Sequence, residues 1–149
     1  MTLLGALIAA AGPGAVESDV FATTDPAEIA SMLASLVAKA IGVEVRDGLW
    51  YRSSVAAVAG LRLDDGQLVV VHAYRHDVTP RFIDGIVRVQ SHLAEVGFPS
   101  ARPLSGPVSA AGLLGRVESL RPDPGPRRFA AHEMRASWRL VRTQRAPRL

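Results

Sequence analysis

The sequence has no cysteine and a single lysine, Lys39, among its 149 residues. The lack of cysteine excludes disulfide frameworks, thiolate metal sites and cysteine nucleophiles, and it fits a reducing compartment, so we expect a cytoplasmic protein. No apolar run approaches the roughly 20 residues that span a bilayer, so no membrane association is expected. The apolar content of 48% and the charged content of 21% are typical of a globular chain.

The first eleven residues are apolar, but no Lys or Arg precedes them. A secretory signal normally begins with a basic region. We therefore interpret residues 1–11 as a short packed helix, with an export signal as the alternative, and residues 12–24 as a connection.

Charge is distributed unevenly along the chain. Residues 1–100 carry seven basic and eleven acidic side chains, whereas residues 101–149 carry ten Arg and three acidic side chains. A basic tail is one feature of nucleic-acid-binding proteins, and Arg135, Arg139, Arg142 and Arg145 recur at helical spacing. The near absence of lysine instead indicates a GC-rich coding bias, because phosphate binding does not require Arg to the exclusion of Lys. Nucleic acid is therefore not the expected partner.

Capping residues and hydrophobic spacing predict the first long helix. Asp25 can serve as the N-cap, Pro26 suits the first turn, and Gly42 ends the apolar repeat. Residues 43–46 alternate like a strand that Asp47-Gly48 breaks, and residues 50–54 indicate a turn. Residues 55–63 and 67–74 then predict a hairpin around Asp64-Asp65-Gly66.

The second half of the chain predicts a further helix, two short strands and a C-terminal helix, with no internal repeat of the first half. Thr79-Pro80 can cap and start a helix that Gly97 ends, and residues 102–104 and 113–120 indicate short strands around a Gly/Pro turn. Residues 121–126 predict a loop because three prolines fall there, and residues 130–145 favour a helix. The predicted fold is α+β, a five-stranded antiparallel sheet with a packed helix and with further helices at both ends.

Several segments follow one another in an order and spacing that match a known family: Gly60-Leu-Arg-Leu-Asp-Asp-Gly66, Val69-Val-Val-His-Ala-Tyr74, Val87-Arg-Val-Gln-Ser-His-Leu93, Gly97-Phe-Pro-Ser-Ala-Arg-Pro-Leu-Ser-Gly-Pro107 and Val117-Glu-Ser-Leu-Arg-Pro-Asp-Pro-Gly125. In these segments the chain resembles the aminoglycoside phosphotransferase-like family, which has a kinase-like fold, over roughly residues 25–135. The resemblance implies an N-terminal lobe over residues 25–120, after an N-terminal helix and linker over 1–24. Residues 121–149 would form a Pro-rich linker and an Arg-rich tail.

The resemblance implies a nucleotide site, with ATP and Mg²⁺ as the ligands. Gly48, Ser53 and Ser54 would cover the phosphates. His72 stands where the family has its phosphate-anchoring strand lysine, and the helix carboxylate that would pair with it is expected near Ile86, with Asp84 the closest acid. Glu118, Ser119 and Leu120 would form the hinge that receives adenine through backbone groups.

The resemblance assigns the catalytic and metal-binding aspartates to a second lobe, so we expect no catalytic residue and no metal ligand here. The Arg-rich end suggests a truncated gene, by frameshift or premature stop, and a lobe that is inactive alone. For His72 a hydrogen-bonded strand histidine is favoured over a phosphate ligand or general base. The alternative function is an interaction module that dimerises or binds a partner chain through the exposed lobe face. The remaining alternative is a basic-tailed nucleic-acid binder.

Overall fold

A computed structural model describes residues 1–120 of the chain. Four helices and five strands follow one another in the order α1 (Leu3–Ala11), α2 (Ala15–Phe21), α3 (Pro26–Ile41), β1 (Val45–Ser53), β2 (Ala57–Leu63), β3 (Leu68–Tyr74), α4 (Pro80–Glu95), β4 (Val108–Ala110) and β5 (Leu113–Ser119). The predicted loop over 121–126 and the predicted helix over 130–145 lie outside the described residues.

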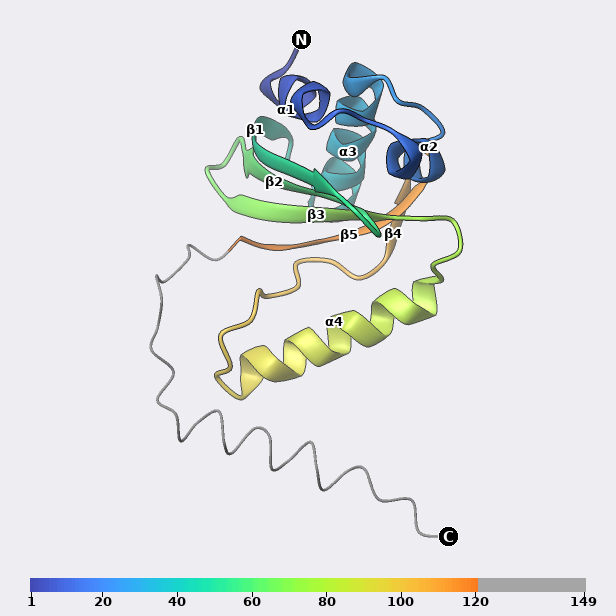
Figure 1. Cartoon of the computed structure of the whole chain (residues 1–149). Coiled ribbons are helices and arrows are strands. Elements are labelled where there is room, and N and C mark those ends of the chain that lie inside the picture. The colour runs from blue at the N-terminus through green and yellow to red at the C-terminus, as the bar shows by residue number, and fades with distance from the viewer. Residues whose placement is uncertain (121–149) are drawn as a thin grey trace, which may run out of the picture.

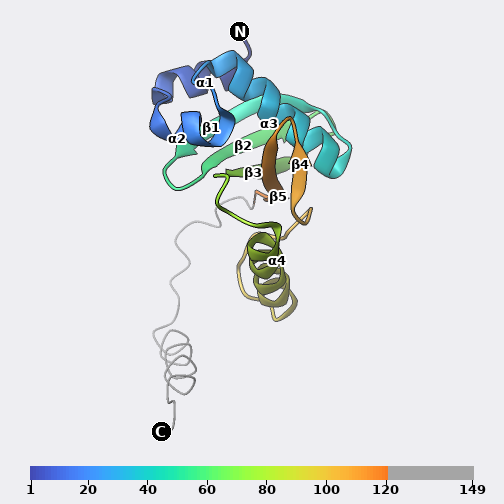
Figure 2. The same cartoon turned by 90° about the vertical axis from the view of Figure 1, so that its right-hand side faces the viewer.

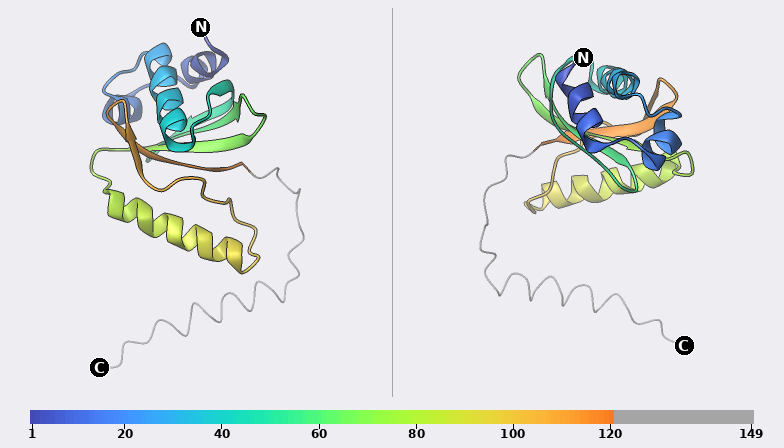
Figure 3. Two further views of the ribbon diagram at one scale, coloured as in Figure 1. Left: turned by 180° about the vertical axis from the view of Figure 1, so that it is seen from behind. Right: turned by 45° about the horizontal axis from the view of Figure 1, so that its top comes forward.

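The strands form one antiparallel sheet in the order β1-β2-β3-β5-β4. Helices α1, α2 and α3 cover one face of this sheet, and α4 lies across the opposite face (Figure 1 and Figure 2). The two further views in Figure 3 show the same three layers. The arrangement confirms the predicted α+β class with its five-stranded antiparallel sheet and packed helix.

The hydrophobic core lies between the sheet and the N-terminal helices. Successive strand residues point to opposite faces, and on β3 it is Val69, Val71 and Ala73 that are fully buried against α3 and its neighbours. We call this the core face of the sheet. His72 and Tyr74 alternate with these residues and therefore lie on the opposite side of the sheet, the side on which α4 is found (Figure 1). We call this side the open face.

The capping predictions for the long helices are confirmed. The Asp25 side chain accepts a hydrogen bond of 2.9 Å from the Ala27 amide, and Gly42 ends α3 in the left-handed region. Thr79 caps α4 in the same manner, through a hydrogen bond of 3.3 Å from the Phe82 amide to its hydroxyl.

The expectation that residues 12–24 are only a connection was wrong, because they contain α2. Val20 and Phe21 of this helix are buried in the core, and the Glu17 carboxylate accepts hydrogen bonds from the Gly14 amide and the Tyr51 hydroxyl. Burial by itself would raise the pKa of Glu17, but the hydrogen bonds from Gly14, Ser53 and Tyr51 lower it. The same burial and contact with Glu17 raise the pKa of Tyr51.

The predicted break at Asp47-Gly48 and the predicted turn over residues 50–54 were also wrong. Strand β1 runs without interruption from Val45 to Ser53, because two register shifts absorb the extra residues against β2. A β-bulge of this kind inserts a residue while the strand continues. The connection to β2 is therefore limited to Ser54, Val55 and Ala56.

The two C-terminal strands were located only in part. Strand β5 is close to the predicted range, but β4 lies at Val108–Ala110, inside the segment expected to be a turn. Residues 102–104 form only an isolated bridge between Pro103 and Glu118. Proline has no amide hydrogen to donate to a neighbouring strand, which explains why no ladder forms there.

The expected packed helix at the N-terminus is confirmed, since Leu4 and Ile8 of α1 are buried in the core. No helix among residues 1–120 has the length and apolar character to cross a membrane.

Substitution Ile8→Ala tests whether α1 belongs to the core. Ile8 is fully buried, so we expect the free energy of unfolding to fall by about 2–4 kcal/mol in urea denaturation. Leu3→Ala is the matched control, because Leu3 lies on the same helix but is 56% exposed. Equal, small effects of the two substitutions would show that α1 does not pack as described.

Candidate functional site

Two rows of side chains cross the open face of the sheet. In the first, the strand register aligns Arg52 of β1 with Val58 of β2, His72 of β3 and Arg116 of β5. Neighbouring strands lie about 4.8 Å apart, so this row places three basic side chains on one line across the sheet. We call it the basic row.

The second row lies beside the first and joins Trp50, Gly60, Val70 and Glu118. The Trp50 indole lies directly on Gly60, because a Cβ at position 60 would be only 2.3 Å from the indole Nε1. The Arg52 guanidinium is 5.9 Å from the centre of the indole, which is within the range of a cation–π contact. We call this second line the Trp50 row.

Glu118 is the centre of a polar network that joins the sheet to α4. Its carboxylate contacts the His72 Nε2 at 3.0 Å and accepts hydrogen bonds from the Gln90 amide at 2.7 Å and the Arg116 guanidinium at 2.6 Å. Arg116 also donates to the side-chain oxygen Oε1 of Gln90 at 2.9 Å and to the Tyr74 hydroxyl at 2.8 Å. We call these side chains the strand–helix network: His72, Tyr74, Gln90, Arg116 and Glu118.

The charged centre of the network is buried, and its two charges neutralise each other. Arg116 and Glu118 are only 5% and 8% exposed, respectively, and their charges pair directly. Burial alone would raise the pKa of Glu118, but the hydrogen bonds from His72, Gln90 and Arg116 outweigh it and lower the pKa to about 2. Glu118 therefore remains a carboxylate throughout the physiological range.

The favoured interpretation of His72, a strand histidine with a hydrogen-bonded partner, is confirmed by its contact with Glu118. The helix residue that reaches this network is Gln90, whereas Asp84 is exposed. Ile86, the position where the helix carboxylate was expected, lines a groove along α4. The only lysine does not replace the expected phosphate ligand, since Lys39 donates to the Ser109 carbonyl oxygen and joins α3 to β4.

The structure does not bring Gly48, Ser53 and Ser54 together in a glycine-rich loop. Gly48 lies inside β1 on the core face, where an added Cβ would come within 2.8 Å of the Leu4 Cα. Ser53 ends β1 on the same side as Tyr51, and Ser54 begins the turn, its amide donating to the Ala56 carbonyl oxygen. Helix α1 approaches the β1 backbone so closely at position 48 that a side chain would collide with it, which explains the glycine there.

Two backbone donors of the predicted hinge already have partners. The Ser119 amide donates to the Arg102 carbonyl oxygen at 2.8 Å, and the Leu120 amide donates to that of Leu68 at 3.0 Å. The Ser119 hydroxyl accepts from the Arg102 amide at 2.9 Å. The Glu118 side chain is part of the strand–helix network, whereas the resemblance implies a role for the backbone groups of this residue.

Sequence reasoning missed Trp50, Arg52, Tyr74, Gln90 and Arg116. The alternation of buried Val117 with Arg116 and Glu118 is a pattern that could have indicated a polar face on β5. Their contacts with His72 and Tyr74 depend on the pairing of strands more than 40 residues apart, which cannot be read from the sequence pattern. Within residues 1–120 no group of three or more His, Cys, Asp or Glu side chains is arranged to hold a metal ion.

Comparison of the chain with known proteins gave no matching family model, no matching curated protein and no matching solved structure.

Substitution Glu118→Gln tests the energetic role of the network. A carboxylate whose pKa is lowered stabilises the folded state above its unfolded value of 4.5, and this stabilisation is lost as the pH falls towards about 2. We expect the substitution to lower the free energy of unfolding at pH 7 by about 3 kcal/mol, because Arg116 remains buried without its counter-charge.

The pH dependence provides the control for this prediction. Between pH 5 and 2 the wild-type protein should lose more stability than the Glu118→Gln variant, as measured by urea denaturation at each pH. Substitution Glu95→Gln, at an exposed position of α4, should leave both quantities nearly unchanged. Identical pH profiles for the wild type and Glu118→Gln would contradict the assignment.

Proposed function

We propose that the chain is a kinase-like N-terminal lobe of the phosphotransferase type that binds a nucleotide on its open face. The observation that carries the proposal is that Arg52, the exposed end of the basic row, lies beside the Trp50 indole. Cationic side chains attract phosphates, and an indole surface stacks with a nucleobase. A ligand that is both anionic and aromatic therefore fits this face better than a ligand with only one of these two properties.

Within this proposal, the base stacks on the face of the Trp50 indole that is turned away from Gly60, and the phosphates lie towards Arg52. Arg52 is exposed and its guanidinium is already close to the indole. Arg116 supports the site indirectly, since it is buried and committed to Glu118. Mg²⁺ would enter with the phosphates of ATP, as the family resemblance implies.

The hydrogen bonds of the predicted hinge favour a site that discriminates only weakly between adenine and guanine nucleotides. The amides of Ser119 and Leu120 are hydrogen-bonded within the protein, so they do not offer free donors to an adenine ring. We therefore expect ATP and GTP to bind with similar affinity. The proposal concerns binding, because the family resemblance assigns the carboxylates of phosphoryl transfer to a second lobe. A cytoplasmic location, where nucleotides are abundant, is part of the proposal.

Fluorescence of Trp50 provides the direct test. The chain has two tryptophans, so the Trp138→Phe variant reports on Trp50 alone. We expect Mg-ATP and Mg-GTP to change this fluorescence saturably in the millimolar range. Arg52→Gln should weaken binding about fivefold, as expected for loss of one exposed charged contact of about 1 kcal/mol.

Two further variants make the test specific. Gly60→Ala should disrupt binding, because the new methyl group occupies the space of the indole. Arg46→Gln is the matched control, since Arg46 is an exposed arginine on the same strand that lines a groove with α1 and α3 instead. An unchanged Trp50 signal at saturating Mg-ATP, or equal effects of Arg52→Gln and Arg46→Gln, would refute the nucleotide site.

A second candidate function, binding of a partner chain, is favoured by one observation on α4. Phe82 and Val89 of this helix are each 60% exposed, although both are large apolar residues. Exposed apolar patches on a folded domain commonly mark interaction sites. This candidate uses the exposed apolar side chains of α4, whereas the nucleotide proposal uses side chains of the sheet.

A further inference from the structure

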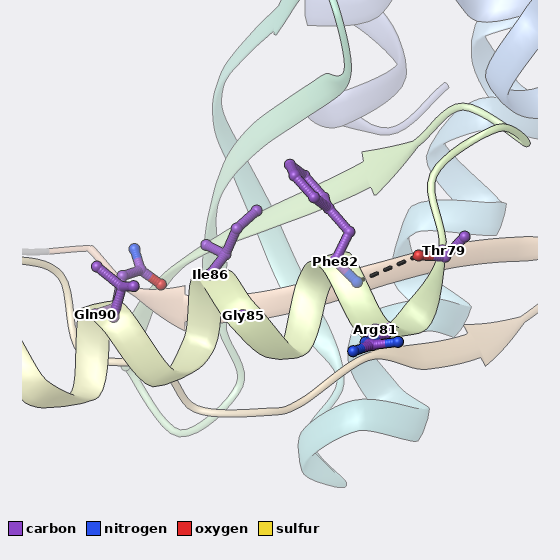
Figure 4. Close-up of a pocket in the computed structure, with 7 residues that line it drawn as sticks. Thr79, Arg81, Phe82, Gly85, Ile86 and Gln90 are labelled. Atoms are coloured by element: carbon purple, nitrogen blue, oxygen red, sulfur yellow. Dashed lines mark hydrogen bonds between the residues drawn. The ribbon is translucent and has the colours of Figure 1, made fainter. Parts of the chain in front are cut away.

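Helix α4 carries an apolar groove along one flank, next to the side that faces the sheet through Gln90. The groove has a volume of about 690 Å³ and is open to solvent, and all its lining residues come from α4 and its N-cap: Thr79, Arg81, Phe82, Gly85, Ile86, Val89 and Gln90. Figure 4 shows Phe82, Ile86 and Gln90 projecting from one side of the helix, with Arg81 turned away from them. We call this surface the α4 groove.

The shape of the α4 groove suits a helix. Phe82 and Ile86 are four residues apart and form a ridge, as in the packing of ridges into grooves between helices. Gly85 provides a notch between Phe82 and Val89, because a Cβ built at this glycine meets no heavy atom within 4 Å. A large apolar side chain from a partner helix can enter this notch and contact Phe82 and Val89 on either side.

The solvent edge of the groove is basic. At 100° per residue, Arg81, Arg88 and His92 follow one another along the side of the helix next to Phe82 and Val89. All three are exposed, and none of the ion pairs found among residues 1–120 involves them. Asp84 and Glu95 lie beside Arg88, on the side of this arginine that is farther from the groove.

We propose that the α4 groove docks an amphipathic helix of another protein, with an apolar stripe that enters the Gly85 notch and an acidic edge that faces Arg81 and Arg88. This proposal rests on the second candidate function and names the chemistry of its partner. Charge complementarity of this kind speeds association and excludes competing partners with the wrong sign.

The same charges argue against the two occupants that the chain itself offers. An antiparallel packing of two α4 helices across Gly85 would bring Arg81 of one copy near Arg88 of the other, and a parallel packing would set each arginine against its equivalent. Residues 121–149 carry eight Arg and two acidic side chains, so their charge also has the wrong sign. The basic edge therefore selects a foreign acidic helix.

Two designed peptides test the proposal on the full-length chain. Both are helical, about 18 residues long, and share one leucine stripe, but one has Glu along its edge and the other has Lys. In fluorescence anisotropy at about 50 mM salt we expect the Glu peptide to bind about tenfold tighter, and this ratio should shrink in high salt because the edge charges are exposed.

Variants of the groove separate shape from charge. Gly85→Leu fills the notch and should weaken binding of the Glu peptide at least tenfold, as should Phe82→Ser. The double substitution Arg81→Glu and Arg88→Glu should reverse the preference, so that the Lys peptide binds better. Val55→Ser is the matched control, because Val55 is 80% exposed and lies in the β1–β2 turn. Circular dichroism verifies that each variant is folded.

The outcomes distinguish the failure of this inference from the failure of the function beneath it. Equal binding of the two peptides, or a preference that survives charge reversal, would overturn the acidic partner while leaving a docking groove. Binding of neither peptide would overturn both. Self-association in sedimentation experiments that is lost in Phe82→Ser would also overturn the proposal, since it would identify a second copy as the occupant.

Discussion

The position of α4 depends on the contacts that the Glu118 carboxylate makes. This carboxylate contacts His72 of β3 and accepts hydrogen bonds from Arg116 of its own strand and Gln90 of α4, and so joins the centre of the sheet to the helix. Ile83 is the only fully buried side chain of α4. Because apolar burial holds this helix only weakly, the partly buried polar contacts of Gln90 fix its orientation, and with it the direction in which the α4 groove faces.

The two faces of the sheet have separate tasks. On the core face, alternate residues of β2, β3 and β5 pack against α1, α2 and α3 and supply the hydrophobic stability of the domain. On the open face, the residues between them form the basic row, the Trp50 row and the strand–helix network. Since neighbouring residues of one strand serve different faces, a substitution at Val71 is expected to act on stability, whereas one at His72 acts on the network.

Much of the fold could be predicted from the sequence, because the residues that begin and end its helices and turns act on their immediate neighbours in the chain. Asp25, Pro26 and Gly42 bound α3, Thr79 caps α4, and Asp64-Asp65-Gly66 turns the β2–β3 hairpin. Bulges in β1 and the bridge at Pro103 escaped prediction, since both depend on a neighbouring strand. The site was predicted less well. His72 and Glu118 were singled out separately, but their contact joins positions 46 residues apart, and no local pattern in α4 indicates that Gln90 reaches Glu118.

Hydrogen exchange of the α4 amides measures the central claim most directly, because it reports the opening of this helix separately from the sheet. If Glu118 holds α4 in place, the Glu118→Ala variant should lose protection along α4, from the second turn to its end, while the amides of β2 and β3 keep theirs. Unchanged protection of α4 in this variant, or an equal loss in α4 and in the core strands, would contradict the account.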